Sequence, residues 1–143
     1  MKKRITILSF FTISLIGCIH DKGTLLTRSI EIGDKKCIIQ QMPEEFQEGT
    51  RSGSFDYFRV IIESKLALED SSHLSYINFG FDNSIRKIVK SDTLYPAFVH
   101  RIANGKQENF EYIVSFEKAS KEREFDIYID DHVFGIGQVT LNF

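Results

Sequence analysis

Alternation of apolar and polar residues marks several short segments of this chain as β-strands. The clearest is residues 110–116, whose apolar face consists of Phe110, Tyr112, Val114 and Phe116. Residues 58–63 place Phe58, Val60 and Ile62 on one face, and in residues 125–129 Asp126 faces away from an apolar set. Because side chains of a strand alternate between its two faces, each of these segments is expected to bury one face in a core.

Weaker patterns of the same kind predict further strands, separated by turn residues. They comprise residues 29–32, 37–41, 74–81, 97–102 and 139–143. Residues 85–89 are short and partly charged, which suits a strand at the edge of a sheet. Turns are expected at Gly33-Asp34 and at Asn104-Gly105-Lys106, because these residue types favour tight reversals.

Helical signals are sparse by comparison. One helical turn is expected to begin at Pro43, because proline suits the first position of a helix. Residues 63–70 and 119–123 carry helix-forming residues without caps or a complete apolar stripe, so we interpret them as connectors. Seven or eight short strands at this spacing predict an all-β fold, a single antiparallel β-sandwich of the immunoglobulin-like type. A small closed barrel is the alternative arrangement.

The first eighteen residues have a different pattern. Three cations, Lys2, Lys3 and Arg4, precede an apolar run of about 12 residues at 5–16, which is the layout of a secretory signal peptide and too short to span a bilayer. The run ends in Leu15-Ile16-Gly17-Cys18, which resembles the lipobox of bacterial lipoproteins. The alternative is a short membrane anchor that happens to end in cysteine, and its length and flanking charges disfavour it.

The lipobox resemblance implies a set of domain boundaries. Residues 1–17 would be the signal peptide, residues 18–28 a tether, and residues 29–143 the β-sandwich domain. Cys18 would carry lipid, and two or three acyl chains hold a protein stably on a membrane where one chain holds it marginally. The residue after Cys18 is Ile19 rather than aspartate, and 19–22 holds no acidic cluster. The resemblance therefore implies an outer-membrane protein facing the periplasm, rather than one at the inner membrane or cell surface.

Removal of the signal peptide changes the charge and the thiol content. The formal net charge falls from −2 to −5, because all three charges in residues 1–17 are positive. An acidic domain has no electrostatic reason to bind nucleic acid. With Cys18 lipidated, Cys37 has no intramolecular disulfide partner. Because Cys37 lies in an apolar strand-like run, we expect a buried, inert thiol rather than a nucleophile.

The order of features in the last 70 residues resembles the telokin-like, immunoglobulin-like sandwiches of bacterial envelope lipoproteins. A strand ends in the turn Phe81-Asp82-Asn83, a glycine turn follows at Asn104-Gly105-Lys106, and the strand Ile113–Phe116 ends in phenylalanine. The resemblance covers about half of the mature chain, and it implies a fold and no functional residue.

Candidate chemistry is sparse. Asp130, Asp131 and His132 form the densest polar cluster, and with His100 they could bind a metal ion, because carboxylate and imidazole are competent ligands. A β-turn between two strands explains the cluster better, since no ligand spacing supports a metal. The Gly-x-Gly at 135–137 lacks the following helix that a phosphate cradle needs. No cofactor is implied.

These observations favour a non-catalytic role. We expect a lipid-anchored binding or scaffolding module of the cell envelope, held on the membrane through Cys18 and presenting strand edges or loops to an envelope protein. Tyr95 and Phe98 are candidates for an exposed aromatic patch, or equally for the core. The alternative is a metal- or small-ligand-binding, possibly enzymatic, periplasmic domain centred on His100, Asp130, Asp131 and His132.

Overall fold

The computed structural model describes residues 25–43, 54–65, 71–118 and 124–143. The strands found there are β1 (Thr27–Ile32), β2 (Lys35–Gln41), β3 (Phe55–Glu63), β4 (Ile85–Val89), β5 (Asp92–Leu94), β6 (Phe98–Ile102), β7 (Asn109–Glu117), β8 (Asp126–Asp131) and β9 (Gly137–Asn142). A helical segment precedes β4 and consists of the short α-helix α1 (Ser71–Ser75), the π-helical turn η2 (Tyr76–Gly80) and the 3₁₀ turn η3 (Phe81–Asn83).

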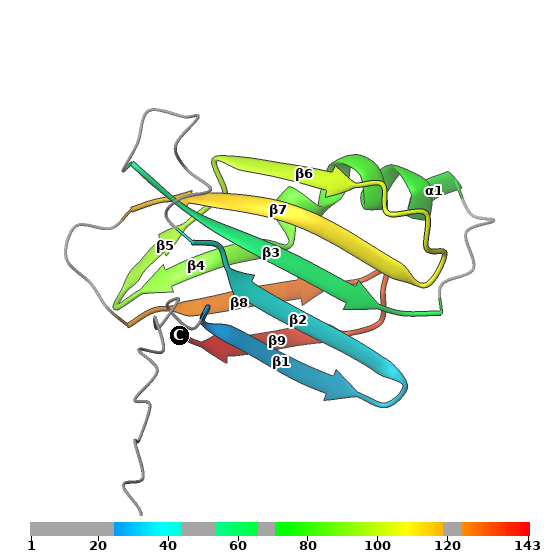
Figure 1. Ribbon diagram of the computed structural model, residues 1–143, viewed down its shortest axis with the longest axis horizontal. Helices are drawn as coiled ribbons and strands as arrows, with labels where there is room; N and C mark the ends of the chain where they lie inside the picture. The colour runs from blue at the N-terminus through cyan, green and yellow to red at the C-terminus, as the bar shows by residue number, and fades with distance from the viewer. Residues whose placement is uncertain (1–24, 44–53, 66–70, 119–123) are drawn as a thin grey trace, which may run out of the picture.

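The strands form two sheets that pack face to face (Figure 1). One sheet has five strands in the order β1-β2-β3-β7-β6, and the other has four in the order β5-β4-β8-β9. Every strand pair is antiparallel. The expected all-β sandwich is therefore confirmed and is consistent with an immunoglobulin-like fold, with nine described strands where seven or eight were predicted.

The predicted alternation produces the core. Strands β3 and β7 pair along nine residues each, so that Phe58 lies opposite Val114 and Val60 opposite Tyr112. All the apolar residues predicted to face inward on these two strands are buried. Ile127 and Ile129 of β8 close the core from the other sheet. A domain with this many buried large side chains is stabilised mainly by removal of apolar surface from water.

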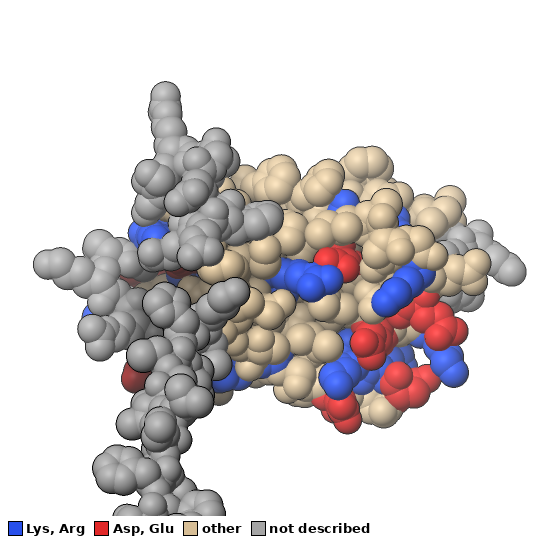
Figure 2. Space-filling view, viewed as in Figure 1, with Lys and Arg blue, Asp and Glu red and all other residues tan. Residues whose placement is uncertain are grey.

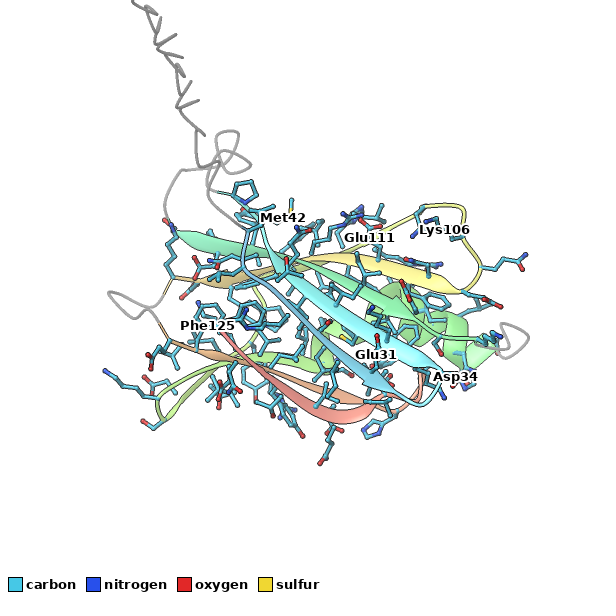
Figure 3. All side chains as sticks on the ribbon, turned by 60° about the horizontal axis from the view of Figure 1, so that its bottom comes forward. Glu31, Asp34, Met42, Lys106, Glu111 and Phe125 are labelled. Carbon is cyan, nitrogen blue, oxygen red and sulfur yellow. The ribbon has the colours of Figure 1, made fainter. Side chains whose placement is uncertain are left out.

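Aromatic side chains fill the core in two groups. Phe58 contacts Phe116, Phe125 and Phe143 edge to face, and Phe125 stacks on Phe143 with ring centroids 5.2 Å apart. Figure 3 shows Phe125 at one end of the sandwich, whereas Asp34 and Lys106 lie at the other end. The second group contains Tyr76, Phe81, Phe110, Tyr112 and Phe134. Edge-to-face pairs of this kind add about 0.5–1.5 kcal/mol each beyond their buried area.

The two long sides of the sandwich are closed differently. On one side, β1 and β9 approach each other, and Arg28 donates from Nε to the carbonyl oxygen of Asn142 at 2.8 Å. The C-terminus therefore lies beside the beginning of β1 (Figure 1). On the other side, the helical segment lies beside β6 and leads from the five-stranded sheet into β4.

The prediction of a strand at residues 74–81 is wrong, because these residues form helical turns. Ile77 and Phe81 are buried whereas Phe79 between them is exposed, so the buried positions recur every four residues rather than every two. This spacing belongs to a helix, and the alternation of residue types in the sequence did not reflect burial.

The edge position predicted for residues 85–89 is also wrong. Strand β4 lies inside its sheet, between β5 and β8. Its lysine, which suggested an edge, points inward: Lys87 is 3% exposed, and its Nζ lies 2.6 Å from a carboxylate oxygen of Asp56 in the facing sheet. The same Nζ lies 4.4 Å from the centroid of the Phe125 ring. A buried cation is tolerated there because the Asp56 carboxylate balances its charge and the electron-rich face of the Phe125 ring attracts it.

The ends of the chain differ slightly from expectation. Strand β1 begins at Thr27, two residues before the predicted domain start, so residues 27 and 28 belong to the sheet. The predicted signal peptide with Cys18, most of the helical turn after Pro43, and connector 119–123 lie outside the described residues. In the parts of the chain that the structure describes, no helix is long and apolar enough to cross a bilayer.

Candidate partner-binding groove

A groove lies between the helical segment and the beginning of β6, on the side of the sandwich away from β1 and β9. Its cavity volume is about 220 Å³. It is lined by Asn78, Phe79, Phe81, Asp82, Pro96, Ala97, Phe98, Val99 and Tyr112. We call this feature the β6 groove.

The floor of the β6 groove is a pair of stacked aromatic rings. Phe81 and Tyr112 lie with ring centroids 4.4 Å apart and an interplanar angle of 20°, and both are buried. Tyr112 donates its hydroxyl hydrogen to the carbonyl oxygen of Ile77 at 2.9 Å. Burial raises the pKa of Tyr112, so the hydroxyl stays a neutral donor at physiological pH. The floor is therefore rigid and apolar.

The rim of the β6 groove exposes two phenylalanines. Phe79 is 83% exposed and Phe98 is 51% exposed. The ring of Phe98 stacks on the imidazole of His100, with centroids 5.9 Å apart. Two more large exposed hydrophobic residues of the described ranges, Leu74 and Tyr95, lie in the same two segments but do not line the groove, and the Arg86 guanidinium lies 5.5 Å from the centroid of the Tyr95 ring. A gathering of this kind is typical of a surface that contacts another molecule.

The local backbone explains why Phe79 points outward. Residues 76–80 form a π-helical turn, which is wider than an α-helical turn and is often found at functional sites. Its last residue is Gly80, where an added Cβ would come within 3.0 Å of the Tyr76 ring. The helical segment is fixed to the sheet by Arg101, whose Nη1 donates to the amide oxygen of Asn78 at 2.6 Å. These contacts hold Ile77 and Phe81 in the core and leave Phe79 at the rim.

Among the described residues that line the β6 groove, Asp82 has the charged side chain. It is exposed, and one of its carboxylate oxygens accepts a hydrogen bond from the amide of Asn83 at 3.0 Å. Elsewhere, charges gather over the β1–β2 hairpin at the lower right of Figure 2, where Glu31 pairs with Lys36 and Asp34 with Lys35. The groove therefore combines aromatic side chains with a single negative charge.

Strand β6 forms the long edge of the groove. It is the last strand of the five-stranded sheet, and in the described part of the chain it pairs with β7 alone. Val99 and Arg101 lie opposite Val114 and Tyr112, so their side chains point toward the core face, whereas Phe98 and His100 point to the outer face. An edge strand leaves alternate N–H and C=O groups without a strand partner.

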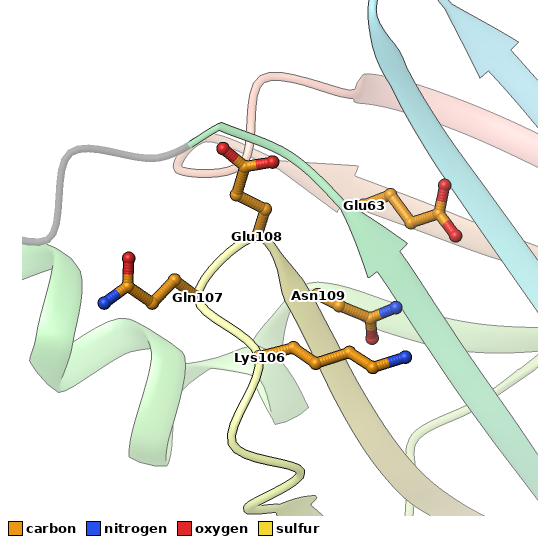
Figure 4. A pocket seen from close by; sticks show the side chains of 5 residues that line it. All are labelled: Glu63, Lys106, Gln107, Glu108 and Asn109. Carbon is orange, nitrogen blue, oxygen red and sulfur yellow. The ribbon is translucent and has the colours of Figure 1, made fainter.

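A second hollow lies at the other end of the molecule and is polar. It is lined by Glu63, Lys106, Gln107, Glu108 and Asn109 and has a volume of about 530 Å³. Figure 4 shows that the side chains of Gln107, Lys106 and Glu108 point in different directions rather than toward a common centre. This open hollow therefore presents no assembled set of ligands.

The structure separates the predicted metal candidates. His100 lies on β6, in the five-stranded sheet, whereas Asp130, Asp131 and His132 lie at the end of β8 in the other sheet. His132 is exposed, with its Nε2 3.6 Å from a carboxylate oxygen of Asp130. In the ranges that the structure covers, no three His, Cys, Asp or Glu side chains form a group that could hold a metal ion.

Asp131 has a structural task in the loop that follows β8. Its side chain is 2% exposed, and its two carboxylate oxygens accept hydrogen bonds from three backbone N–H groups at 2.9 Å, those of Val133, Phe134 and Ile136. The predicted turn is thus displaced along the chain: Asp130 and Asp131 belong to β8, His132 and Gly135 lie in the connecting loop, and Gly137 opens β9. Cys37 is buried, as expected, and burial together with the Asp131 charge raises the pKa of its thiol to about 12.

Comparison of the chain with protein-family models, with curated proteins and with solved structures finds no significant match in any of the three. Sequence reasoning had singled out Tyr95 and Phe98 as a candidate aromatic patch, and both are exposed. It missed Phe79, because residues 74–81 were interpreted as a strand. The spacing of Ile77 and Phe81 was the signal that could have revealed it.

Proposed function

We propose that this chain is a lipid-anchored protein of the cell envelope that acts as a non-catalytic binding or scaffolding module. The observation that carries the proposal is the gathering of exposed aromatic residues around the β6 groove. Burying a phenylalanine stabilises a complex by about 1.5–3 kcal/mol relative to leaving it in water. Two exposed phenylalanines on the rim of one apolar groove fit the centre of a protein interface better than isolated surface residues.

The anchor half of the proposal rests on the lipobox resemblance at Leu15-Ile16-Gly17-Cys18. Eight residues lie between Cys18 and the beginning of β1 at Thr27. A chain of that length reaches at most about 30 Å, so a lipidated Cys18 would keep the domain close to the membrane surface. Strands β1 and β6 begin at the same end of the sandwich (Figure 1), so the groove would lie in its membrane-proximal half. This placement favours a partner that is itself at the membrane.

Replacement of the lipid-bearing residue tests the anchor. Cys18→Ser is expected to release the protein from membranes or leave it as the uncleaved precursor, because serine offers no thiol for the thioether bond. Fractionation of cells followed by intact-mass measurement of each fraction gives the result. If the variant is cleaved normally and stays with the membrane, the lipoprotein assignment is wrong.

In-cell crosslinking from the rim tests the binding half. A photo-crosslinking residue at position 79 of the full-length chain is expected to capture one defined envelope protein, because Phe79 lies at the centre of the proposed interface. Absence of any protein adduct at that position would contradict the proposed function.

A further inference from the structure

We infer that the β6 groove binds an extended segment of the partner protein, which adds a strand to β6, places one large apolar side chain in the groove and sets a lysine or arginine against Asp82. The inference rests on the proposed function and specifies how the partner is recognised. It is carried by the open edge of β6, by the volume and lining of the groove, and by its charge.

The edge of β6 supplies the backbone part of the interaction. Its five residues, Phe-Val-His-Arg-Ile, contain three apolar side chains and neither proline nor lysine, the residues that commonly protect edge strands. The cation that is present, Arg101, is bound to Asn78 and lies over the Phe110 ring. A segment of another chain can therefore pair with this edge without displacing a protecting charge.

The position of the groove supplies the side-chain part. In an added strand, the residue opposite Val99 points to the same face as Val99, and that face leads into the groove. The volume of about 220 Å³ is sufficient for a benzene-sized ring, because a cavity of about 150 Å³ in another protein accommodates benzene. Phe79 would cover such a ring from the helical segment, and the stacked Phe81 and Tyr112 would lie beneath it.

The negative charge of Asp82 determines which partner residue is favoured beside the apolar side chain in the groove. Asp82 lies on the lining with one carboxylate oxygen bonded to Asn83. A lysine or arginine beside the apolar anchor would pair with this carboxylate, whereas an acidic residue there would be repelled. Because the pair would be exposed, it contributes specificity more than affinity.

Peptide selection tests this mode directly. A phage-displayed library of random 12-residue peptides is applied to the immobilised full-length chain in detergent. The enriched peptides are expected to alternate apolar and polar residues, with a basic residue next to an aromatic or large aliphatic one. Scanning the best peptide with N-methyl groups should weaken binding about ten-fold or more at every second amide, because alternate amides would face β6.

Two variants then measure the contribution of the Asp82 carboxylate to peptide binding. Asp82→Asn is expected to weaken binding of the basic peptide about two- to five-fold and to leave unchanged the binding of the same peptide with its cation replaced by glutamine. The control is Asp34→Asn, which changes net charge equally at the distal β1–β2 hairpin and should have no effect.

Other outcomes overturn the inference. Apolar positions spaced three and four residues apart would show a helical partner, and failure to enrich any peptide, or equal effects of the two variants, would contradict strand addition. Self-association through β6, seen as a dimer in sedimentation, would make a second copy the occupant. Crosslinking from position 79 does not depend on how the partner is bound. A defined adduct there, together with any of these results, would show that strand addition is wrong while the proposed function stands.

Discussion

Single residues in this protein have roles that their chemical type does not reveal. Asp131 belongs to a cluster that suggests metal binding, yet its carboxylate organises the loop between β8 and β9 by accepting three backbone hydrogen bonds. Phe79 has the residue type of a core position and is 83% exposed. In both cases the backbone conformation, of the loop that follows Asp131 and of the π-helical turn at Phe79, decides the role of the side chain.

Removal of the Asp131 carboxylate is expected to destabilise the fold strongly. Asp131→Ala would leave three N–H groups without their acceptor, two of them on buried residues, and the free energy of unfolding should fall by about 3 kcal/mol or more. The neighbouring change Asp130→Ala removes a partly exposed carboxylate and should cost less than about 1 kcal/mol. Urea denaturation of both variants measures the difference, and equal losses would contradict the loop role of Asp131.

Elements were predictable where burial and residue type agree. In β3, β7 and β8 the apolar residues at the predicted inward positions of each strand are buried. The helical segment was not predictable by alternation, because Ile77, Phe79 and Phe81 recur at every second residue as in a strand. Strand β4 was assigned to an edge because of its charges, and the compensating carboxylate of Asp56 lies thirty-one residues away in the sequence. The sequence does not show such a pair, because its two residues come together only when the two sheets pack face to face.

The Lys87–Asp56 pair connects the two sheets and gives an element-scale prediction. Lys87→Met should lower the free energy of unfolding by about 3 kcal/mol, because it leaves the Asp56 carboxylate without its cation beside the core. The double variant Lys87→Met with Asp56→Leu should recover most of that loss, because both charges are gone and the volume is filled. Urea denaturation of the two single variants and the double variant gives the coupling free energy between Lys87 and Asp56. A single variant as stable as the parent chain would show that the pair does not matter.

At the scale of the whole molecule, the two sides of the sandwich differ in a way that suits a binding module. One side is closed by β1 against β9, with Arg28 bound to the carbonyl of Asn142. The other side has an open edge strand, an apolar groove and the exposed rim of Phe79 and Phe98. The sequence predicted the sandwich but not this asymmetry, because strand order and the position of the helical segment depend on tertiary packing.

The asymmetry makes the central claim testable by one comparison within the same chain. The photo-crosslinking residue is placed either at position 79, on the rim of the groove, or at Thr140, an exposed position on β9 at the closed side. Full-length protein is irradiated in intact cells, and adducts are identified by mass spectrometry. We predict one predominant envelope-protein adduct from position 79 and little or none from position 140. Capture of the same protein from position 140 but not from position 79, or equal capture from both, would contradict the account.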